Sequence, residues 1–306
     1  PPPPPPPPYH PHPPPPQPHV AVRRQRQMSI RDSMYAGDSN FGLFPEIGTS
    51  WGLSTATEAD PMMYGADGSI ADGTFVGYYS HQADFFFQVV FVATAMSIVS
   101  GAVAGRMKML PFFLFAVFLS GFIYPSQGFW NWGGGFEGLG ISYSDYAGSG
   151  TVHLCGAAAA LAGAILLGPR LGRFTKKGEP APVKPFAASS IPLVTIGVFI
   201  LWLGWFGFNG GSQLAMGTFD DAVAVSKIFI NTNLAACGGV MAAAIVTRLA
   251  AGKTDVVQML NGAIGGLVSI TAEPLMPSPI AAILIGAVGG VIAVSYTHLT
   301  LPTNSN

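Results

Sequence analysis

The sequence predicts an all-α polytopic membrane protein with about seven helices that cross the bilayer. Of its 306 residues, 49% are hydrophobic and only 9% are charged, against about a quarter charged in an ordinary soluble domain. Apolar runs without acidic or basic residues recur after residue 79, and short polar connections separate them. Backbone polar groups in lipid must be satisfied within their own segment, so these runs are predicted to be helices. The net charge of −1 indicates neither a nucleic-acid nor an acidic partner.

Residues 1–40 are not expected to belong to the bundle. They open with eight consecutive prolines, and a segment rich in Pro, His, Gln and Arg cannot build a core or span a bilayer. We expect a disordered, non-native segment, with Met28 as one candidate for the native start. Residues 41–78 are polar and rich in Gly, Asp, Ser and Thr, and are predicted to form an extracytoplasmic loop.

The transmembrane core is predicted over residues 79–295. The expected spans are residues 85–105, 109–124, 152–167, 191–208, 228–246, 256–271 and 280–294. Several are shorter than the roughly 17 to 25 residues of a spanning helix, and neutral flanking residues are expected to extend them. Glycine and alanine clusters within the spans predict close approach of helix backbones.

Charged residues between the spans predict their orientation, because cytoplasmic loops collect Lys and Arg. The connections after the first, third and fifth spans carry Arg106, Lys108, Arg170, Arg173, Lys176, Lys177, Lys184, Arg248 and Lys253. The intervening connections carry acidic residues, including Asp220 and Asp221, and Lys227 is the exception. The first span is therefore predicted to run from outside to inside.

His153 lies one turn into the third predicted span. An ionisable side chain inside a span is costly and by default indicates a functional site. The alternative is a histidine that is hydrogen-bonded to a neighbouring helix. Asp145, at the outer end of the same helix, either caps the helix N-terminus or holds a cation.

Aromatic residues form a second group of candidates near the outer ends of the spans. Phe87 and Phe91 lie one turn apart in the first span. Trp132 precedes three glycines, and Phe208 lies four residues before Ser212. Each aromatic residue by itself is more often an interfacial anchor. Together, the ring faces and one hydroxyl acceptor suit a small cation that loses its water.

These segments resemble the motifs of the ammonium transporter family (Amt/MEP/Rh), and in particular its bacterial Amt type. The matching segments follow the family's order and spacing over residues 76–294, and they are FQVVF (87–91), WGGG (132–135), DYAGSGTVH (145–153), GWFGFNGGS (204–212) and NGAIGGLV (261–268). The resemblance implies an Amt/Rh-type helical bundle with about seven of the family's usual eleven spans. It also implies transport of ammonium or ammonia for nitrogen uptake.

The resemblance implies two sites near the outer end of a pore. Trp132, Ser212 and Phe91 correspond to a recruitment site, where ring faces and a hydroxyl replace the water around ammonium. Phe87 and Phe208 correspond to paired rings that gate the pore below this site.

Two further roles follow from the resemblance. His153 corresponds to the first of two pore histidines, and Asp145 to the acid that supports the site and the start of its helix. Because desolvation favours the neutral form of an amine, a narrow apolar pore with an imidazole could pass ammonia and handle the proton separately. No cofactor and no metal are implied.

The resemblance further implies a homotrimer in the inner (plasma) membrane, with a PII-type regulatory protein on the cytoplasmic side of the complete protein. Two spans are expected before residue 41, and the second pore histidine is expected in a span after residue 295. Residues 296–306 match nothing in the family and are interpreted as a non-native polar tail. We therefore expect these 306 residues to be a fragment that is inactive in transport by itself.

Two rival functions stay open. One is a channel for another small neutral solute, although no Asn-Pro-Ala pair of the aquaporin kind occurs in the sequence. The other is an ammonium sensor built on the same core, for which a signalling domain would be expected. An enzyme is not expected, because the sequence has no phosphate-binding loop, metal-ligand cluster or plausible catalytic triad.

Overall fold

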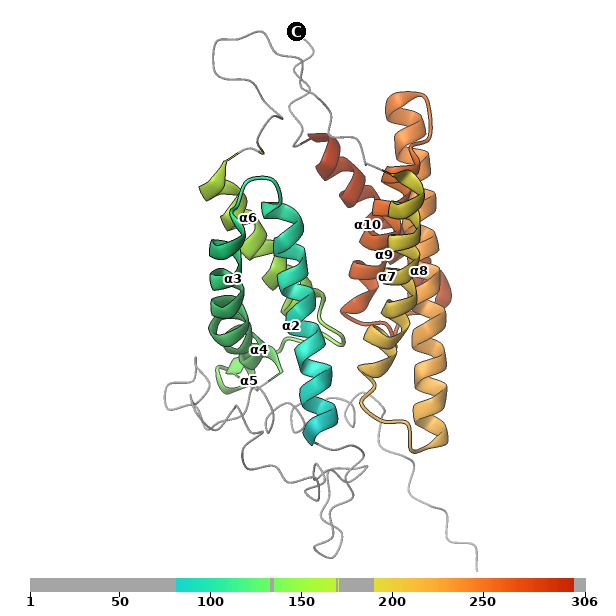
Figure 1. Ribbon diagram of the computed structural model, residues 1–306. Coiled ribbons are helices and arrows are strands. Elements are labelled where there is room, and N and C mark those ends of the chain that lie inside the picture. The colour runs from blue at the N-terminus through green and yellow to red at the C-terminus, as the bar shows by residue number, and fades with distance from the viewer. Residues whose placement is uncertain (1–80, 133–134, 169, 171–189, 300–306) are drawn as a thin grey trace, which may run out of the picture.

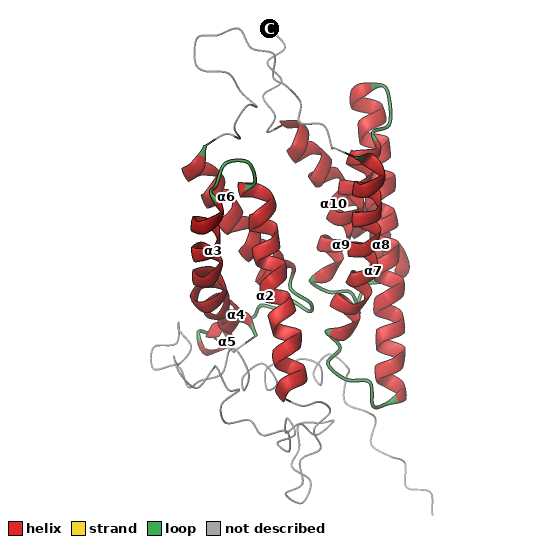
Figure 2. Cartoon of the chain, in the orientation of Figure 1, coloured by secondary structure: helices red, strands yellow, loops and turns green. Residues whose placement is uncertain are grey.

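The computed structural model describes residues 81–132, 135–168, 170 and 190–299. Every regular element within these ranges is a helix, and no strand occurs in them (Figure 2). The prediction of an all-α protein is therefore confirmed. The predicted N-terminal segment 1–40 and the predicted loop 41–78 lie outside the described residues.

The helices form two groups along the chain, which appear as separate bundles in Figure 1. The first group comprises α2 (His81–Val103), α3 (Met109–Phe118), η1 (Leu119–Ile123), α4 (Tyr124–Asn131), α5 (Gly135–Gly138), η2 (Ser149–Leu154) and α6 (Cys155–Leu167). The second group comprises α7 (Ile191–Gly211), α8 (Phe219–Ala251), α9 (Val256–Thr271) and α10 (Pro279–Leu299). Both η1 and η2 are π-helical turns, and each continues directly into the α-helix that follows it.

Each predicted span coincides with a helix. Five helical segments of the described residues are long and apolar enough to cross a bilayer: Phe86–Val103, Met109–Asn131, Ser149–Leu167, Ile191–Gly211 and Phe219–Ala251. The other two predicted spans coincide with α9 and α10, which are shorter apolar helices. Large apolar side chains cover the outward faces, as in Leu166 and Leu249, which are 85% and 81% exposed. Faces of this kind are typical of a protein surrounded by lipid.

Several predicted boundaries are wrong. The second span continues to Asn131 instead of ending at residue 124, because α3, η1 and α4 follow one another without interruption. Asp220 and Asp221 lie in the first turn of α8 and not in a connection. Thr218 and Asp221 form a capping box there, in which each side chain accepts the backbone N–H of the other at 3.1 Å. The last helix, α10, continues to Leu299 and so extends beyond residue 294, the predicted end of the seventh span.

Basic residues gather at one end of the helices. The α2–α3 connection, the end of α6 and the α8–α9 connection all lie at the upper end in Figure 1. The described basic residues at this end are Arg106, Lys108, Arg170 and Lys253, together with Arg248 in the last turn of α8. Lys227, near the start of α8, remains the exception. This distribution is typical of the cytoplasmic side of a membrane protein.

Helices α8, α9 and α10 pack backbone against backbone. A Cβ atom added at Gly239 of α8 would overlap the carbonyl oxygen of Gly262 on α9. A Cβ atom added at Gly290 of α10 would overlap the carbonyl oxygen of Gly239. The prediction that small residues let the helices approach closely is confirmed for this group.

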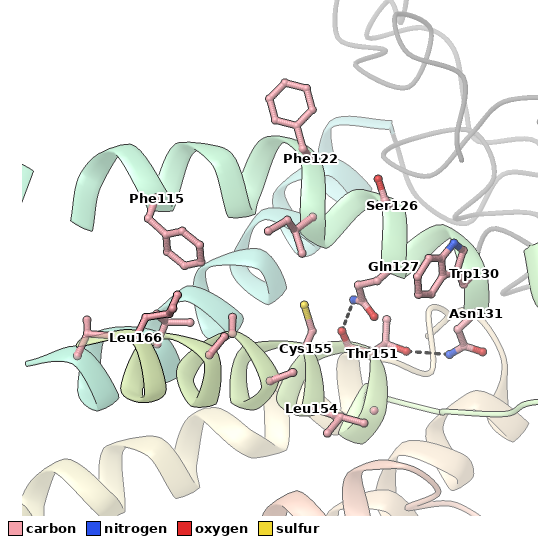
Figure 3. A pocket seen from close by; sticks show the side chains of 18 of the residues that line it. Phe115, Phe122, Ser126, Gln127, Trp130, Asn131, Thr151, Leu154, Cys155 and Leu166 are labelled. Carbon is pink, nitrogen blue, oxygen red and sulfur yellow. Dashed lines mark hydrogen bonds between the residues drawn. The ribbon is translucent and has the colours of Figure 1, made fainter. Parts of the chain in front are cut away.

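The first group encloses a groove. An open cavity of about 1050 Å³ lies between the α3–α4 span and α6, and α2 contributes to its wall. Apolar side chains such as Phe115 and Leu166 line most of its length, and polar side chains such as Gln127 and Asn131 line one end (Figure 3).

The two groups meet where η2 begins. The Ala147 N–H donates to the carbonyl oxygen of Thr271 at 2.9 Å, and Ser149 Oγ donates to the carbonyl oxygen of Val268 at 2.5 Å. These bonds fasten the start of η2 to the end of α9. The predicted site residues therefore lie at the junction of the two groups.

Candidate functional site

Asp145 closes the N-terminal end of the helix formed by η2 and α6. Its buried carboxylate accepts four backbone N–H groups. Oδ1 accepts from Gly148 at 3.1 Å and Ser149 at 2.8 Å, and Oδ2 accepts from Gly150 at 2.9 Å and Thr151 at 2.7 Å. These are donors that a helix start leaves without intrahelical partners. Of the two alternatives that the sequence left open for Asp145, the structure shows the cap.

Tyr143 lies beside this cap and is about half exposed. Its partial burial and, to a smaller degree, the carboxylate of Asp145 raise the pKa of Tyr143 above its ordinary value. The Tyr143 phenol is therefore neutral at physiological pH.

His153 lies in the π-helical turn η2 and is only 7% exposed. Gly148 precedes the turn with φ 103°, a left-handed conformation that favours glycine. The Gly148 carbonyl oxygen accepts the backbone N–H groups of Val152 at 3.0 Å and His153 at 3.1 Å, and His153 Nδ1 lies 3.0 Å from it. Because a carbonyl oxygen only accepts, the last contact is a hydrogen bond when Nδ1 carries the hydrogen. Nε2 of the neutral ring is then an acceptor.

Five rings at the junction form a continuous series, called the ring series below. It starts at Trp132, next to the end of α4, and continues to Phe91 on α2, with ring centroids 5.9 Å apart. Phe91 stacks on Phe208 of α7 at 4.3 Å. Phe208 lies 5.5 Å from His153, whose ring stacks on Trp205 at 5.1 Å. The ring series thus connects both groups of helices.

A small cavity adjoins the Trp132 end of the ring series. Its volume is about 10 Å³, roughly the space that one water molecule needs. It is lined by Phe87, Gln88, Phe91, Trp132, Tyr146, Ser212 and Leu214. Ser212 Oγ donates its hydrogen to the carbonyl oxygen of Phe208 at 2.8 Å. The structure therefore brings the three residues predicted for recruitment, Trp132, Ser212 and Phe91, to one cavity.

The ring that stacks on Phe208 is not the predicted one. We predicted that Phe87 and Phe208 form the pair, but the ring on Phe208 is that of Phe91, with an interplanar angle of 27°. Phe87 contacts Phe91 instead, with centroids 4.6 Å apart. Phe87 and Phe91 lie one turn apart on α2 and so share a face of the helix. Only their side-chain positions distinguish the two.

Comparison with known proteins places the chain in a family. Residues 51–301, more than half of the chain, match the model of the Ammonium Transporter Family. The chain belongs to the ammonium transporter family. The resemblance seen in its motifs is thereby confirmed, and its apolar helices make this family member a multi-pass membrane protein.

Curated relatives and solved structures agree with this assignment. The chain is 42% identical over 218 residues to the ammonium transporter Amt2 of Archaeoglobus fulgidus, which covers 68% of the chain and 45% of Amt2. It is 42% identical over 222 residues to a putative ammonium transporter of Synechocystis, covering 72% of the chain and 49% of that protein. The chain thus spans about half the length of the curated relatives it matches.

A solved sensor Amt protein superposes on the chain with a TM-score of 0.70 at 27% identity, over 91% of this chain and 64% of the sensor chain. These relatives are named as transporters or as a sensor, and none of the three is named as an enzyme.

In this ammonium transporter family member, Trp205 lies in the GWFGFNGGS segment, but no role in the site was predicted for it from the sequence. Trp205 stacks on His153, and its Nε1–H donates to Thr271 Oγ1 at 2.8 Å. Its position three residues before Phe208 was a usable signal, because a helix places both rings on one face.

Leu214 and the Tyr146–Gln213 pair were also missed, and no sequence signal points to them. The Tyr146 hydroxyl donates to Gln213 Oε1 at 2.5 Å. Leu214 has φ 59°, the one positive φ of a non-glycine residue in the described part of the chain. Such strain costs about 1–3 kcal/mol and often occurs at functional sites.

Proposed function

We propose that this chain forms the conducting core of a transporter that passes ammonium, or ammonia derived from it, across a membrane. The strongest support is the ring series, which connects a cavity of the size of one water molecule with a buried histidine at the junction of two helix groups. Family membership points to the same substrate, because the curated relatives named above are described as ammonium transporters.

Recruitment of the cation takes place at the small cavity. An ammonium ion is close to water in size, and the faces of Trp132 and Phe91 attract a cation through their π systems. The Ser212 hydrogen is directed to the Phe208 carbonyl, so its oxygen acts as an acceptor for an ammonium N–H. Water around the ion is thereby replaced by ring faces and one oxygen.

The gate is the stacked pair of Phe91 and Phe208. Rings with centroids 4.3 Å apart leave no room for an ion between them, so passage requires rotation of a side chain. We expect Phe91→Ala to change methylammonium uptake more than Phe87→Ala does, because only Phe91 stacks on Phe208. An equal effect of the two substitutions would contradict this gate.

His153 receives the substrate beyond the gate. Charge is expensive to bury, and desolvation favours ammonia over ammonium. With Nδ1–H donated to Gly148, Nε2 of His153 can accept a hydrogen bond from the substrate's N–H. Asp145 acts indirectly, since it holds the start of the helix that carries His153.

The assembled protein is a homotrimer in the inner (plasma) membrane, oriented with the basic connections on the cytoplasmic side. A PII-type regulatory protein binds on that side. The concentration of Arg and Lys at one end, with Lys227 as the exception, supports the orientation, and the family resemblance supports the assembly and the partner.

Uptake of labelled methylammonium tests the transport function, in cells that lack their own ammonium transporters and express the protein with its native flanking sequence. We expect uptake that ammonium competes for, and its loss in His153→Ala. Phe199→Leu, on an exposed face of α7, the helix that carries Trp205 and Phe208, serves as the control and should transport normally. Wild-type uptake by His153→Ala would overturn the proposal.

A sensor is the second candidate, because the sensor Amt protein superposes over most of the chain. A sensor would bind ammonium at the same cavity without net uptake. Ammonium binding by a protein that does not move methylammonium into cells would favour this alternative.

A further inference from the structure

We propose, on the basis of the function proposed above, that Gln127 and Asn131 position His153 by clamping the π-helical turn that carries it. Both side chains come from α4 and reach Thr151 of η2, as the dashed lines in Figure 3 show. Gln127 Nε2 donates to the Thr151 carbonyl oxygen, and Asn131 Nδ2 donates to Thr151 Oγ1 at 2.9 Å.

Thr151 is held from three directions. Its side chain accepts from Asn131 and its carbonyl accepts from Gln127, while its own N–H donates to Asp145 Oδ2 at 2.7 Å. Only 3% of Thr151 is exposed. Buried polar groups in an apolar setting hold their partners firmly, since an unmade bond there is costly.

The clamp acts on His153 through the backbone. Thr151 and His153 lie two residues apart in η2, and the turn is π-helical, a rare geometry that often marks functional sites. Bonds from outside the turn help to keep it in this geometry. The Nδ1 contact of His153 with Gly148 and its stacking on Trp205 both depend on where η2 holds the ring.

Gln127 and Asn131 are positioning residues and not part of the conduction path. Thr151 and Leu154 line the groove on the α4 side of η2, whereas His153 contacts Trp205 and Phe208 of α7. The clamp therefore holds η2 on the side away from Trp205 and Phe208. Gln127 and Asn131 are four residues apart on one helix, which lets both side chains reach the same residue.

Uptake kinetics of Gln127→Leu and Thr151→Val test the clamp in the protein with its native flanking sequence. We expect the maximal uptake rate of methylammonium to fall about twofold to tenfold, as the loss of a buried hydrogen bond implies. KM should stay near the wild-type value, because neither residue lines the recruitment cavity. Ser126→Ala, which removes a hydroxyl from the same groove and the same helix, is the matched control and should leave the rate unchanged.

A second measurement does not depend on transport. Protein labelled with 5-fluorotryptophan reports on the stack of His153 and Trp205 by ¹⁹F NMR, with the Trp205 signal assigned from Trp205→Phe. The Trp205 signal is expected to move in Gln127→Leu and Thr151→Val and to stay in place in Ser126→Ala. A moved signal supports the clamp even if the wild-type protein takes up no methylammonium, an outcome that would overturn only the proposed transport function.

The clamp is overturned if the Trp205 signal and the uptake rate stay at wild-type values in both clamp variants. Thr151→Ser keeps the hydroxyl and should retain the wild-type rate; a loss as large as in Thr151→Val would show that the hydroxyl bond is not responsible. Gln127→Leu leaves Thr151 intact, so it decides the question if substitutions at Thr151 prevent folding.

Discussion

Helices α8, α9 and α10 meet backbone against backbone, whereas the α3–α4 span faces α6 across a groove of about 1050 Å³. In the second group, glycine allows the close approach, and the packing depends on the absence of side chains. In the first group, side-chain hydrogen bonds such as those of Gln127 and Asn131 connect the helices.

The difference in packing between the two groups shows how the junction between them is supported. Phe208 and Trp205 come from α7, which packs on α8 and α9. The second group therefore holds these two rings on one side of the junction. His153 and Phe91 come from the first group, where α6 packs on α2 and polar side chains of α4 connect to η2. We therefore expect the α4–η2 contact of the first group to respond to changes in polar side chains and the α8–α9–α10 contacts to changes in side-chain volume.

The largest effect is expected at the cap of the first group. Asp145→Ala removes the acceptor of four buried or partly buried N–H groups and should lower the free energy of unfolding by about 3 kcal/mol or more. Asp255→Ala is the matched cap of α9 in the second group, where the exposed carboxylate accepts from Val257 and Gln258. It should cost only about 0.5–2 kcal/mol. Thermal unfolding of the two purified variants measures both losses of stability. Equal losses would contradict the expected difference between the two caps.

A smaller effect is expected from volume added to the second group. Gly239→Ala places a methyl group against the carbonyl oxygen of Gly262, which is backbone and cannot rotate away. The cost should be about 1–3 kcal/mol. Gly197→Ala on α7 is the control, because no atom outside the adjoining backbone of α7 lies within 4 Å of its added Cβ. It should be neutral or slightly stabilising, since Ala favours helix. Equal melting temperatures of the two variants would contradict the backbone packing.

The smallest effect is expected from volume added along the groove of the first group. Ala162 lines the groove, so that Ala162→Leu finds open space for its larger side chain. We expect the free energy of unfolding to change by no more than about 0.5 kcal/mol. If Ala162→Leu destabilises the protein as strongly as Gly239→Ala does, the first group is packed as tightly as the second.

Much of the fold followed from the sequence. Because lipid admits only segments that satisfy their own backbone, apolar runs without charges predicted helices, and each predicted span coincides with one. The span ends were less predictable. Asp220 and Asp221 look like loop residues, but a capping box draws them into α8, and the run from Met109 continues through η1 to Asn131.

The candidate site, like the fold, could be predicted only in part from the sequence. The sequence by itself determined the family, the residue types at the site and the position of a buried histidine, because motifs and the cost of polar groups in lipid are visible along the chain. Only the tertiary structure decided which phenylalanine stacks on Phe208. Phe87 and Phe91 are one turn apart, so spacing puts both on the same face of α2.

Contacts between side chains that are far apart in the chain could not be predicted from the sequence either. Trp205 stacks on His153, and Thr151 accepts from Asn131, across separations of 52 and 20 residues. Nothing in the local pattern encodes such contacts, since they depend on how helices rotate and approach one another. Composition thus determined that this chain is a helical membrane protein, its motifs determined the ammonium transporter family, and packing decided how its site is held.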